Sequence, residues 1–286
     1  MFAFFGTPRF SVKVLDALES HGMLPAVVVC APDKPRGRGL EPAPAPTKVW
    51  AEARGITVVT PATLRDPAAA EDLMDILANT DWDVFVVAAY AKLIPKHILD
   101  IPRRGCLNIH PSLLPKFRGP SPALSAILAD ERTTGVSIML LDEQMDHGPV
   151  IAQGRIVLDE ADWPPQGSVF EDLLATEGGN LLAEAMPDWI AGTIEAEPQN
   201  EDEATFTKKF TDADALIDLA GDPRTNLLKI RAFDKGPRAY FVTPSGKRVI
   251  ITAAHTENDV LVIDTVIPEG KKEMPYSDFM RGQTNK

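Results

Sequence analysis

The run Asp83-Val84-Phe85-Val86-Val87-Ala88 is apolar at every position after the first and shows no alternation of apolar and polar residues. Similar short runs occur at Phe2–Phe5, Ala26–Cys30, Ile56–Val59 and Gly105–Ile109, and helical patterns separate them. A strand without polar positions is typical of a parallel sheet that helices cover on both faces. The sequence therefore predicts an α/β fold with an open, doubly wound, mostly parallel sheet.

Further along the chain, a long helix is expected at about 169–190. The stretch that follows is acidic, polar and contains proline, so residues 193–211 are expected to form an exposed linker. Residues 1–192 would then be the first domain. Residues 212–286 would be a second, small α+β or β-barrel-like module, because one helical pattern and several strand-like runs follow each other there.

The chain has 286 residues, of which 29 are Lys or Arg and 41 are Asp or Glu, for a net charge of −12. This balance excludes nucleic-acid binding by bulk charge, so any contact with RNA needs a local basic patch. Cys30 and Cys106 are far apart, which argues against a disulfide framework and fits a reducing cytoplasm. The apolar run Val84–Ala91 is far shorter than the ~20 residues of a membrane helix, so we expect a cytoplasmic protein without a membrane partner.

The segment Asn108-Ile109-His110-Pro111-Ser112 lies at the end of a predicted strand. Asn108 and His110 are two residues apart, so their side chains point to the same face. The carboxyl end of a parallel strand is where an open sheet builds its site, and an imidazole beside an amide could accept a proton and polarise a carbonyl group. A hydrogen-bonded structural histidine beside a turn-forming asparagine is the alternative, since motifs this short often arise by chance.

Leu141–Pro149 is expected to be the loop of a hairpin with strands at Val136–Leu141 and Val150–Val157. The loop carries Asp146 and further acidic residues, together with a second histidine. An aspartate near a histidine can hold its tautomer and stabilise its protonated form. A solvated acidic turn is the alternative for this segment taken alone. Neither a His-Glu-x-x-His motif nor a Cys/His spacing is present, so no metal is expected.

Prolines, glycines and three basic residues are concentrated between Pro32 and Pro46. The prolines argue against a helix or an inner strand. The segment follows a parallel strand, where α/β proteins place ligand contacts, although a solvated loop is the alternative. The turn Gly6–Phe10 lacks a Gly-x-Gly-x-x-Gly pattern, and Gly37-Arg38-Gly39 precedes prolines rather than a helix. A nicotinamide-dependent oxidoreductase is therefore disfavoured.

Taken together, these segments resemble the folate-dependent formyltransferases along nearly the whole chain. The end of the chain, with Thr205–Asp218, Ile230–Tyr240 and Gly270–Gly282, is similar to the second domain of family members that act on tRNA. Further matching stretches occur in the family's order, and they are Phe5-Gly6-Thr7-Pro8-x-Phe10, Pro32-Asp33-Lys34-Pro35-x-Gly37-Arg38-Gly39, Ala88-Ala89-Tyr90, Asn108-Ile109-His110-Pro111-Ser112-Leu113-Leu114-Pro115-x-x-Arg118-Gly119, Thr134-Gly135-Val136-Ser137-Ile138-Met139 and Asp142-x-x-x-Asp146-x-Gly148.

The resemblance implies a Rossmann-like catalytic domain followed by a shortened OB-like β domain. It implies transfer of a formyl group from the co-substrate 10-formyltetrahydrofolate to the amino group of initiator methionyl-tRNA, by a monomer without a metal. Asn108 and His110 would stabilise the oxyanion, and Asp146 would orient His110 and raise its pKa. The residues expected to form the folate pocket are Ala88, Ala89, Tyr90, Leu93, Ile94, Pro95, Ser112, Leu113, Leu114, Pro115 and Asp142, and those expected to bind tRNA are Lys34, Arg36 and Arg38.

The sequence departs from the family pattern at several positions. Gln144 stands where glycine is usual, His147 where threonine is usual and Phe117 where tryptophan is frequent, and the second domain is short between Ala253 and Val260. A sugar-nucleotide N-formyltransferase with the same catalytic residues and donor is the alternative. The basic Gly-Arg-Gly loop and the second domain disfavour a glycinamide-ribotide transformylase. The intact catalytic residues disfavour a non-catalytic folate- or RNA-binding relic.

Overall fold

The computed structural model describes residues 1–36 and 41–284. The chain divides into two compact units. The first comprises residues 1–119, 135–156 and 171–206, and the second comprises residues 120–134, 157–170 and 207–286. This grouping differs from the expected division at a linker over 193–211. The expected domains 1–192 and 212–286 stay a prediction about which parts of the chain fold on their own.

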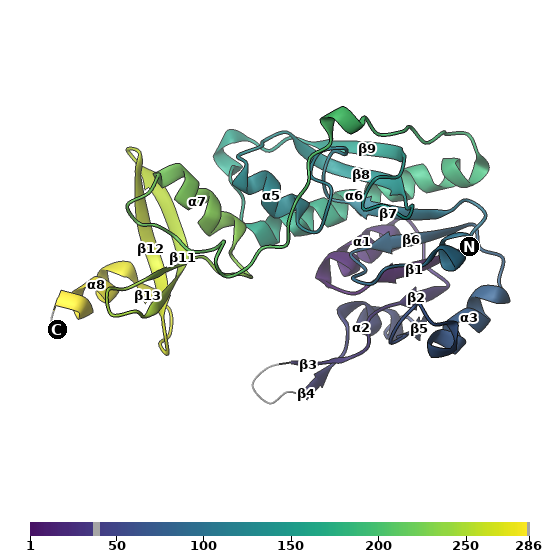
Figure 1. Ribbon diagram of the computed structural model, residues 1–286, viewed down its shortest axis with the longest axis horizontal. Helices are drawn as coiled ribbons and strands as arrows, with labels where there is room; N and C mark the ends of the chain where they lie inside the picture. The colour runs from purple at the N-terminus through teal and green to yellow at the C-terminus, as the bar shows by residue number, and fades with distance from the viewer. Residues whose placement is uncertain (37–40, 285–286) are drawn as a thin grey trace. The chain divides into compact units, whose positions relative to one another are not determined.

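Within the described part of the first unit, a seven-stranded sheet has the order β5-β2-β1-β6-β7-β8-β9 (Figure 1). Neighbouring strands from β5 to β7 run parallel, and β8 runs antiparallel to β7. The predicted mostly parallel α/β sheet is thereby confirmed. The strands are β1 Phe2–Gly6, β2 Val27–Val29, β5 Thr57–Val59, β6 Val84–Ala88, β7 Cys106–His110, β8 Thr134–Leu140 and β9 Val150–Ile156.

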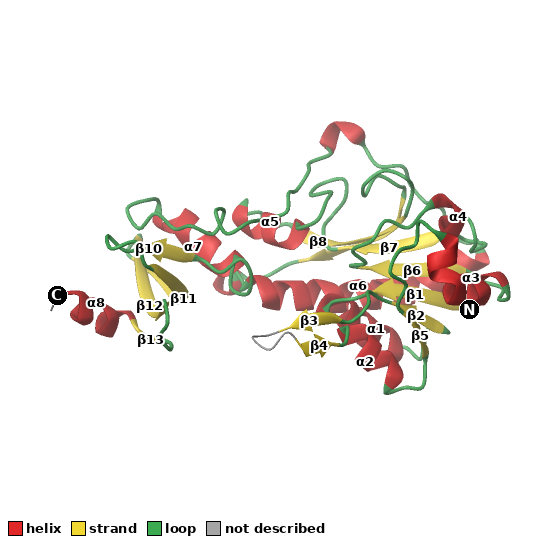
Figure 2. Cartoon of the chain, turned by 60° about the horizontal axis from the view of Figure 1, so that its bottom comes forward, coloured by secondary structure: helices red, strands yellow, loops and turns green. Residues whose placement is uncertain are grey.

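Helices cover both faces of this sheet, as its apolar strands require. On one face, Leu73 of α3 and Ile98 of α4 lie in an apolar cluster with alternate residues of the central strands. On the other face, α6 comes so close to α1 that a side chain at Gly179 would meet the backbone of Val14, and Figure 2 shows both helices along the same side of the strands. The helices are α1 Arg9–Ser20, α2 Pro46–Glu52, α3 Glu71–Ala78, α4 Lys96–Leu99 and α6 Gly167–Ala191.

The carboxyl ends of the central strands and one hairpin loop position the candidate site. β6 ends at Ala88 and β7 ends at His110, and the two strands are parallel neighbours. Ser137 of β8 lies opposite His110. β8 and β9 are adjacent in the sheet, which confirms the predicted hairpin, and residues 141–149 join them.

The proline-rich segment forms a two-stranded antiparallel ladder instead of a loop without secondary structure. Its strands are β3 Lys34–Arg36 and β4 Glu41–Ala43, and Pro35 pairs with Pro42. Because proline has no N–H to donate, such a pair fits a position of the ladder that needs no hydrogen bond. The prolines therefore exclude an inner strand, as expected, but not this short ladder.

The described residues of the second unit include a four-stranded antiparallel sheet in the order β10-β11-β12-β13. β11 and β12 are joined at Asn258 and Asp259, whose φ angles of 49° and 60° are typical of a two-residue hairpin turn. This direct turn accounts for the short sequence before Val260 and confirms a small antiparallel β domain. The elements are α5 Pro122–Leu128, α7 Pro223–Ala232, β10 Tyr240–Val242, β11 Arg248–Glu257, β12 Val260–Pro268, β13 Met274–Pro275 and α8 Tyr276–Thr284. Across the described chain, the helices are all too short or too polar to span a bilayer.

Candidate active site

His110 is the last residue of β7, and only 4% of its surface is exposed. Its Nε2 atom lies 3.0 Å from the carbonyl oxygen of Phe117. Because a carbonyl oxygen can only accept a hydrogen bond, Nε2 carries the hydrogen and donates it. The other ring nitrogen, Nδ1, lies 3.7 Å from Oδ2 of Asp146. The fold thus brings together two of the side chains that the sequence predicts to be catalytic.

Burial lowers the pKa of His110 below its ordinary value and outweighs the Asp146 carboxylate and the hydrogen bond to Phe117, which both act in the opposite direction. The Asp146 carboxylate thus acts on the pKa of His110 in the expected direction, but the net shift is downward because removing a charged imidazole from water dominates. The ring is uncharged at neutral pH. Its Nδ1 lone pair can accept a proton, and the adjacent carboxylate can stabilise the resulting cation.

Asp146 is held in an uncommon backbone conformation. Its φ angle is 50°, in the left-handed region that residues other than glycine seldom adopt. Its Oδ2 atom accepts a hydrogen bond of 2.7 Å from the backbone N–H of Gly119. Phe117, on the facing turn, also has a positive φ, of 61°. Such conformations persist only where the surroundings hold them, and they are frequent at functional sites.

Asn108 precedes His110 by two residues in β7, so both side chains lie on one face of the sheet. The residue is partly exposed. Within the described chain, its side-chain amide has no hydrogen-bond partner. The amide N–H groups are therefore available to a ligand, as stabilisation of an oxyanion requires.

The expected folate-binding stretch after β6 contains an unpaired hydroxyl group. Tyr90 packs edge-on against Phe5, with 5.7 Å between the ring centroids. Its hydroxyl is buried and has no hydrogen-bond partner among the residues that the structure describes. Burial raises the pKa of Tyr90 to about 12, so the hydroxyl keeps its proton. A buried polar group without a partner is unusual and is compatible with a ligand that supplies one.

The expected folate-binding turn after β7 is held by one hydrogen bond within the turn and one from β8. The Ser112 hydroxyl donates to the carbonyl oxygen of Lys116 (2.7 Å), and the Ser137 hydroxyl donates to that of Ser112 (2.7 Å). These bonds hold the backbone carbonyl groups of Ser112 and Lys116 in place. Of the predicted pocket residues, Ala88, Ile94, Ser112 and Leu114 are buried, while Ala89, Leu93, Pro95, Leu113, Pro115 and Asp142 are exposed or half-buried.

Asp142 and His147 interact with each other in the loop that carries Asp146. His147 Nδ1 lies 2.7 Å from Asp142 Oδ2, and its Nε2 lies 3.5 Å from Glu201 Oε1. The side chains of Asp142 and His147 are both about one-third exposed. The described residues contain no cluster of three or more His, Cys, Asp or Glu side chains suited to a metal ion.

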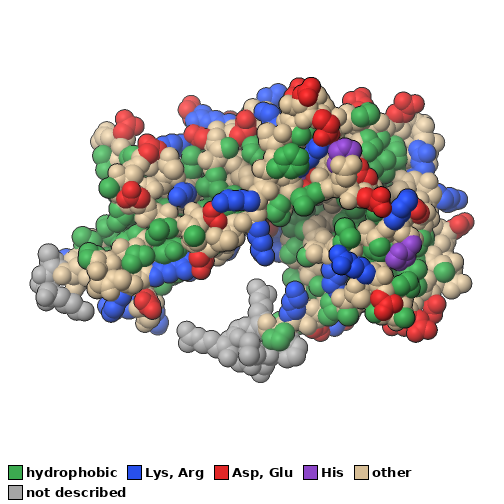
Figure 3. Space-filling view, viewed as in Figure 1, with side chains coloured by type: hydrophobic (Ala, Val, Ile, Leu, Met, Phe, Trp, Pro, Cys, Tyr) green, Lys and Arg blue, Asp and Glu red, His purple; other side chains and the backbone are tan. Residues whose placement is uncertain are grey.

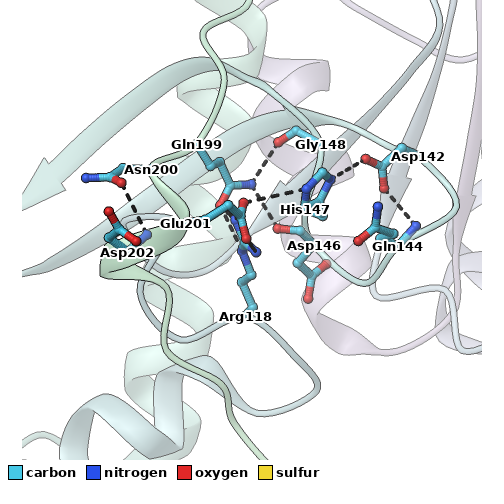
Figure 4. A network of polar contacts seen from close by, with 10 residues as sticks. All are labelled: Arg118, Asp142, Gln144, Asp146, His147, Gly148, Gln199, Asn200, Glu201 and Asp202. Atoms are coloured by element: carbon cyan, nitrogen blue, oxygen red, sulfur yellow. Dashed lines mark hydrogen bonds and ion pairs between the residues drawn. The ribbon is translucent and has the colours of Figure 1, made fainter.

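A buried arginine connects the site to the segment expected to be a linker, a connection missed by the sequence interpretation. Arg118 is only 2% exposed, and its guanidinium forms two hydrogen bonds with the Glu201 carboxylate, of 2.9 and 2.7 Å. It also donates twice to Oε1 of Gln199, at 3.0 and 2.8 Å (Figure 4). The Gln199 amide donates in turn to the carbonyl oxygens of Asp146 and Gly148.

The sequence does contain a weak signal for this connection. An arginine in the interior needs an acidic partner and further acceptors, and residues 195–203 form an acid-rich stretch. However, the sequence does not show that Arg118 is buried. Without that knowledge, an acidic stretch indicates only a solvated linker.

Of the residues expected to bind tRNA, Lys34 is exposed at the start of β3. Arg36 is the last residue of β3, and Arg38 lies outside the described residues. Acidic and basic side chains are interspersed over the face shown in Figure 3. An RNA contact on that face would therefore depend on local groups, as the net charge predicts.

Both the sequence and the fold of this chain are similar to those of known proteins. Residues 1–171 match the family model described as Formyl transferase. A methionyl-tRNA formyltransferase of Roseiflexus castenholzii is 38% identical over 308 residues, covering 98% of this chain and 95% of that protein. The structure of a sugar N-formyltransferase from Shewanella sp FDAARGOS_354 gives a TM-score of 0.64 at 17% identity, covering 90% of this chain and 98% of that one. That of a methionyl-tRNA formyltransferase from Clostridium thermocellum gives 0.60 at 18% identity, covering 94% and 98%. At such low identities the two structures show a shared fold.

Proposed function

This chain belongs to the formyl transferase family, and from that membership we propose that it transfers a formyl group from 10-formyltetrahydrofolate to the amino group of initiator methionyl-tRNA. The observation that carries the proposal is the 38% identity to a methionyl-tRNA formyltransferase over 98% of this chain and 95% of the relative. The similarity thus includes the C-terminal part as well as the sheet. The sugar N-formyltransferase is similar only in fold, at 17% identity.

Formyl transfer forms a C–N bond to the acceptor amine and breaks the C–N bond to the folate. It therefore needs a group that takes a proton from the attacking amine and can return it to the tetrahydrofolate nitrogen that leaves. When bound, the folate co-substrate would supply a formyl group whose oxygen gains negative charge as the amine attacks. His110 is placed to take up the amine proton at Nδ1, since Nε2 is occupied by the Phe117 carbonyl group. Asp146, 3.7 Å from Nδ1, would stabilise the resulting imidazolium. The unpaired Asn108 amide would donate to the oxygen that gains charge.

The folate site would lie along the expected pocket residues after β6 and β7. The buried, unpaired hydroxyl of Tyr90 supports this assignment, because a pterin ring carries polar groups that could complete its hydrogen bonding. Residues Ala88–Pro95, Ser112–Pro115 and Asp142 are proposed to form the walls of the pocket.

The acceptor tRNA would be held by local basic groups, since the chain has a net charge of −12. We assign Lys34, Arg36 and Arg38 to contacts with tRNA phosphates. The protein would act as a cytoplasmic monomer.

The proposal is tested by supplying 10-formyltetrahydrofolate together with each class of acceptor. Purified protein is incubated with charged initiator tRNA and, separately, with amino-sugar nucleotides, and the formylated product is measured. Formylation of methionyl-tRNA is the expected result. Formylation of the sugar nucleotides alone would overturn the assignment of the acceptor, and turnover of neither acceptor would overturn the proposed function.

A further inference from the structure

Residues 197–206, here called the strap, are attached to both loops of the candidate site. The backbone of Glu197 exchanges two hydrogen bonds of 2.8 Å with Val150, at the start of β9. Farther along, the Thr205 carbonyl oxygen accepts from the N–H of Arg118, and the Thr205 hydroxyl accepts from that of Phe117, each at 2.8 Å. The strap thus holds the turn after β7 as well as the base of the loop that carries Asp146.

Gln199 lies between these two attachments, and the two ends of its side-chain amide bind different segments of the site. Its Nε2 donates to the carbonyl oxygens of Asp146 (2.8 Å) and Gly148 (2.7 Å). Its Oε1 accepts two hydrogen bonds, from Nε and Nη2 of Arg118. If the amide were flipped, its oxygen would face the two backbone carbonyl oxygens and its NH2 group would face the Arg118 donors. Only the observed orientation therefore satisfies all four contacts.

These contacts close a ring of interactions around His110 and Asp146. The Phe117 carbonyl oxygen fixes Nε2 of His110, and the Gly119 N–H fixes the carboxylate of Asp146. Arg118 lies between these two residues in the chain, and its side chain reaches Gln199, which holds the backbone of Asp146 (Figure 4). The positive φ of Asp146 makes such external support necessary.

We infer that Gln199 is a positioning residue for formyl transfer: its amide, locked by Arg118, holds the Asp146–Gly148 turn so that the Asp146 carboxylate faces Nδ1 of His110. The inference rests on the proposed function for its kinetic consequences. A displacement of about 1 Å at a reacting group can cost roughly 10²-fold in rate, so a side chain that touches no substrate can still control turnover.

Gln199→Glu is the direct test, because a carboxylate keeps a partner for Arg118 but cannot donate to the two carbonyl groups. We expect kcat to fall by roughly 10²-fold, while KM for each substrate changes by less than about threefold. Asn200→Asp is the matched control, since it makes the same amide-to-carboxylate change on the next residue. Asn200 is exposed, and its acceptor atom, which bonds the N–H of Asp202, is kept. The change removes only the Nδ2 donor to the carboxylate of Glu203, which is itself exposed. Its kcat should stay within about twofold of wild type.

A double-mutant cycle separates positioning from a general structural role. If Gln199 acts through Asp146, adding Gln199→Glu to Asp146→Asn should cost less than about twofold beyond the single Asp146→Asn variant. A purely structural residue would instead lower the active fraction by the same factor in both backgrounds. Multiplicative losses would overturn the inference, as would a kcat of Gln199→Glu close to that of wild type.

A measurement without substrate keeps the inference distinct from the proposed function. In Gln199→Glu, amide hydrogen exchange of residues 143–148 should become faster than in wild type and in Asn200→Asp, because the turn loses both of its external donors. Unchanged exchange would reject the positioning role even if the protein formylates tRNA. If Gln199→Glu does not fold, Gln199→Met removes the donors without adding charge and is measured in the same way. A wild-type protein that formylates neither acceptor would refute the proposed function, and the exchange result would still decide the role of Gln199 in the loop.

Discussion

Nδ1 of His110 lies 3.7 Å from Oδ2 of Asp146, and a single turn of the chain holds both side chains. The Phe117 carbonyl group binds the other nitrogen of the ring, and the N–H of Gly119 binds the same carboxylate oxygen. A separation of 3.7 Å is longer than a hydrogen bond, which fits a neutral ring with its lone pair toward the carboxylate. Uptake of a proton at Nδ1 would turn this arrangement into an attractive pair.

Replacement of any of the proposed catalytic residues should slow the chemical step. We expect His110→Ala, Asn108→Ala and Asp146→Ala each to lower kcat by roughly 10²-fold or more, the cost of removing a proton acceptor or an oxyanion donor. Steady-state formylation with methionyl-tRNA measures this effect, and circular dichroism checks the fold. His97→Ala, at an exposed residue of α4, is the control. Turnover close to wild type in one variant would remove that residue from the mechanism.

Stability should depend on pH through His110. Burial lowers its pKa in the folded state, so below the ordinary pKa of about 6.5 the unfolded chain binds the proton more readily. The free energy of unfolding should therefore increase with pH below about 6.5 and stay constant above it, as far as His110 contributes. Urea unfolding of wild type and His110→Gln across this range isolates the contribution, since other groups titrate alike in both proteins. Parallel pH profiles would contradict the neutral, buried imidazole.

Removal of metal ions should leave turnover unchanged, because the proposed mechanism assigns proton uptake and oxyanion stabilisation to side chains and amide groups. Exhaustive dialysis against a chelator, followed by the formylation assay, tests this. A loss of activity that added zinc restores would show that the proposed mechanism is incomplete.

Arg38 should contribute to the use of tRNA and not to folding. Between its flanking glycines the backbone can approach another molecule closely, and an arginine there can bind a phosphate with two hydrogen bonds. Arg38→Ala should lower kcat/KM for charged tRNA by ~10-fold or more and leave the melting temperature unchanged. Arg65→Ala, at an exposed arginine elsewhere, is the control. Kinetics indifferent to Arg38 and to salt would favour the sugar-nucleotide acceptor.

Close packing between α6 and α1 should make Gly179 intolerant of any side chain. A Cβ atom there would lie 2.6 Å from Cβ of Ala17 and 2.9 Å from the carbonyl oxygen of Val14. The clash should cost roughly 1–3 kcal/mol and exceed the ~1 kcal/mol that alanine gains over glycine in a helix. Urea unfolding should thus show that Gly179→Ala is destabilised. Gly282→Ala in α8 meets no atom within 4 Å and should be neutral or stabilising. Equal effects of the two substitutions would refute the packing argument.

The strands of the sheet could be predicted closely, because burial on both faces leaves a run of apolar residues that is local in the sequence. The expected strand Phe2–Phe5 is β1 Phe2–Gly6, and the expected strand Gly105–Ile109 is β7 Cys106–His110. The short helices α4 and α5 were not predicted, because four to seven residues carry too little periodicity. The resemblance to a family located Asn108, His110 and Asp146, and the fold places His110 and Asp146 side by side.

By itself, the sequence determined the sheet, the order of its strands along the chain and the residue types available for chemistry, since these depend on hydrophobic pattern and on motifs of a few residues. Only the tertiary structure decided that His110 is neutral and that Arg118 is buried. The physical reason is the same for both: the protonation of an imidazole and the need of a guanidinium for partners depend on how much water remains around them. That quantity is set by segments distant in the chain, among them the strap, whose acidic residues alone indicated only a solvated linker.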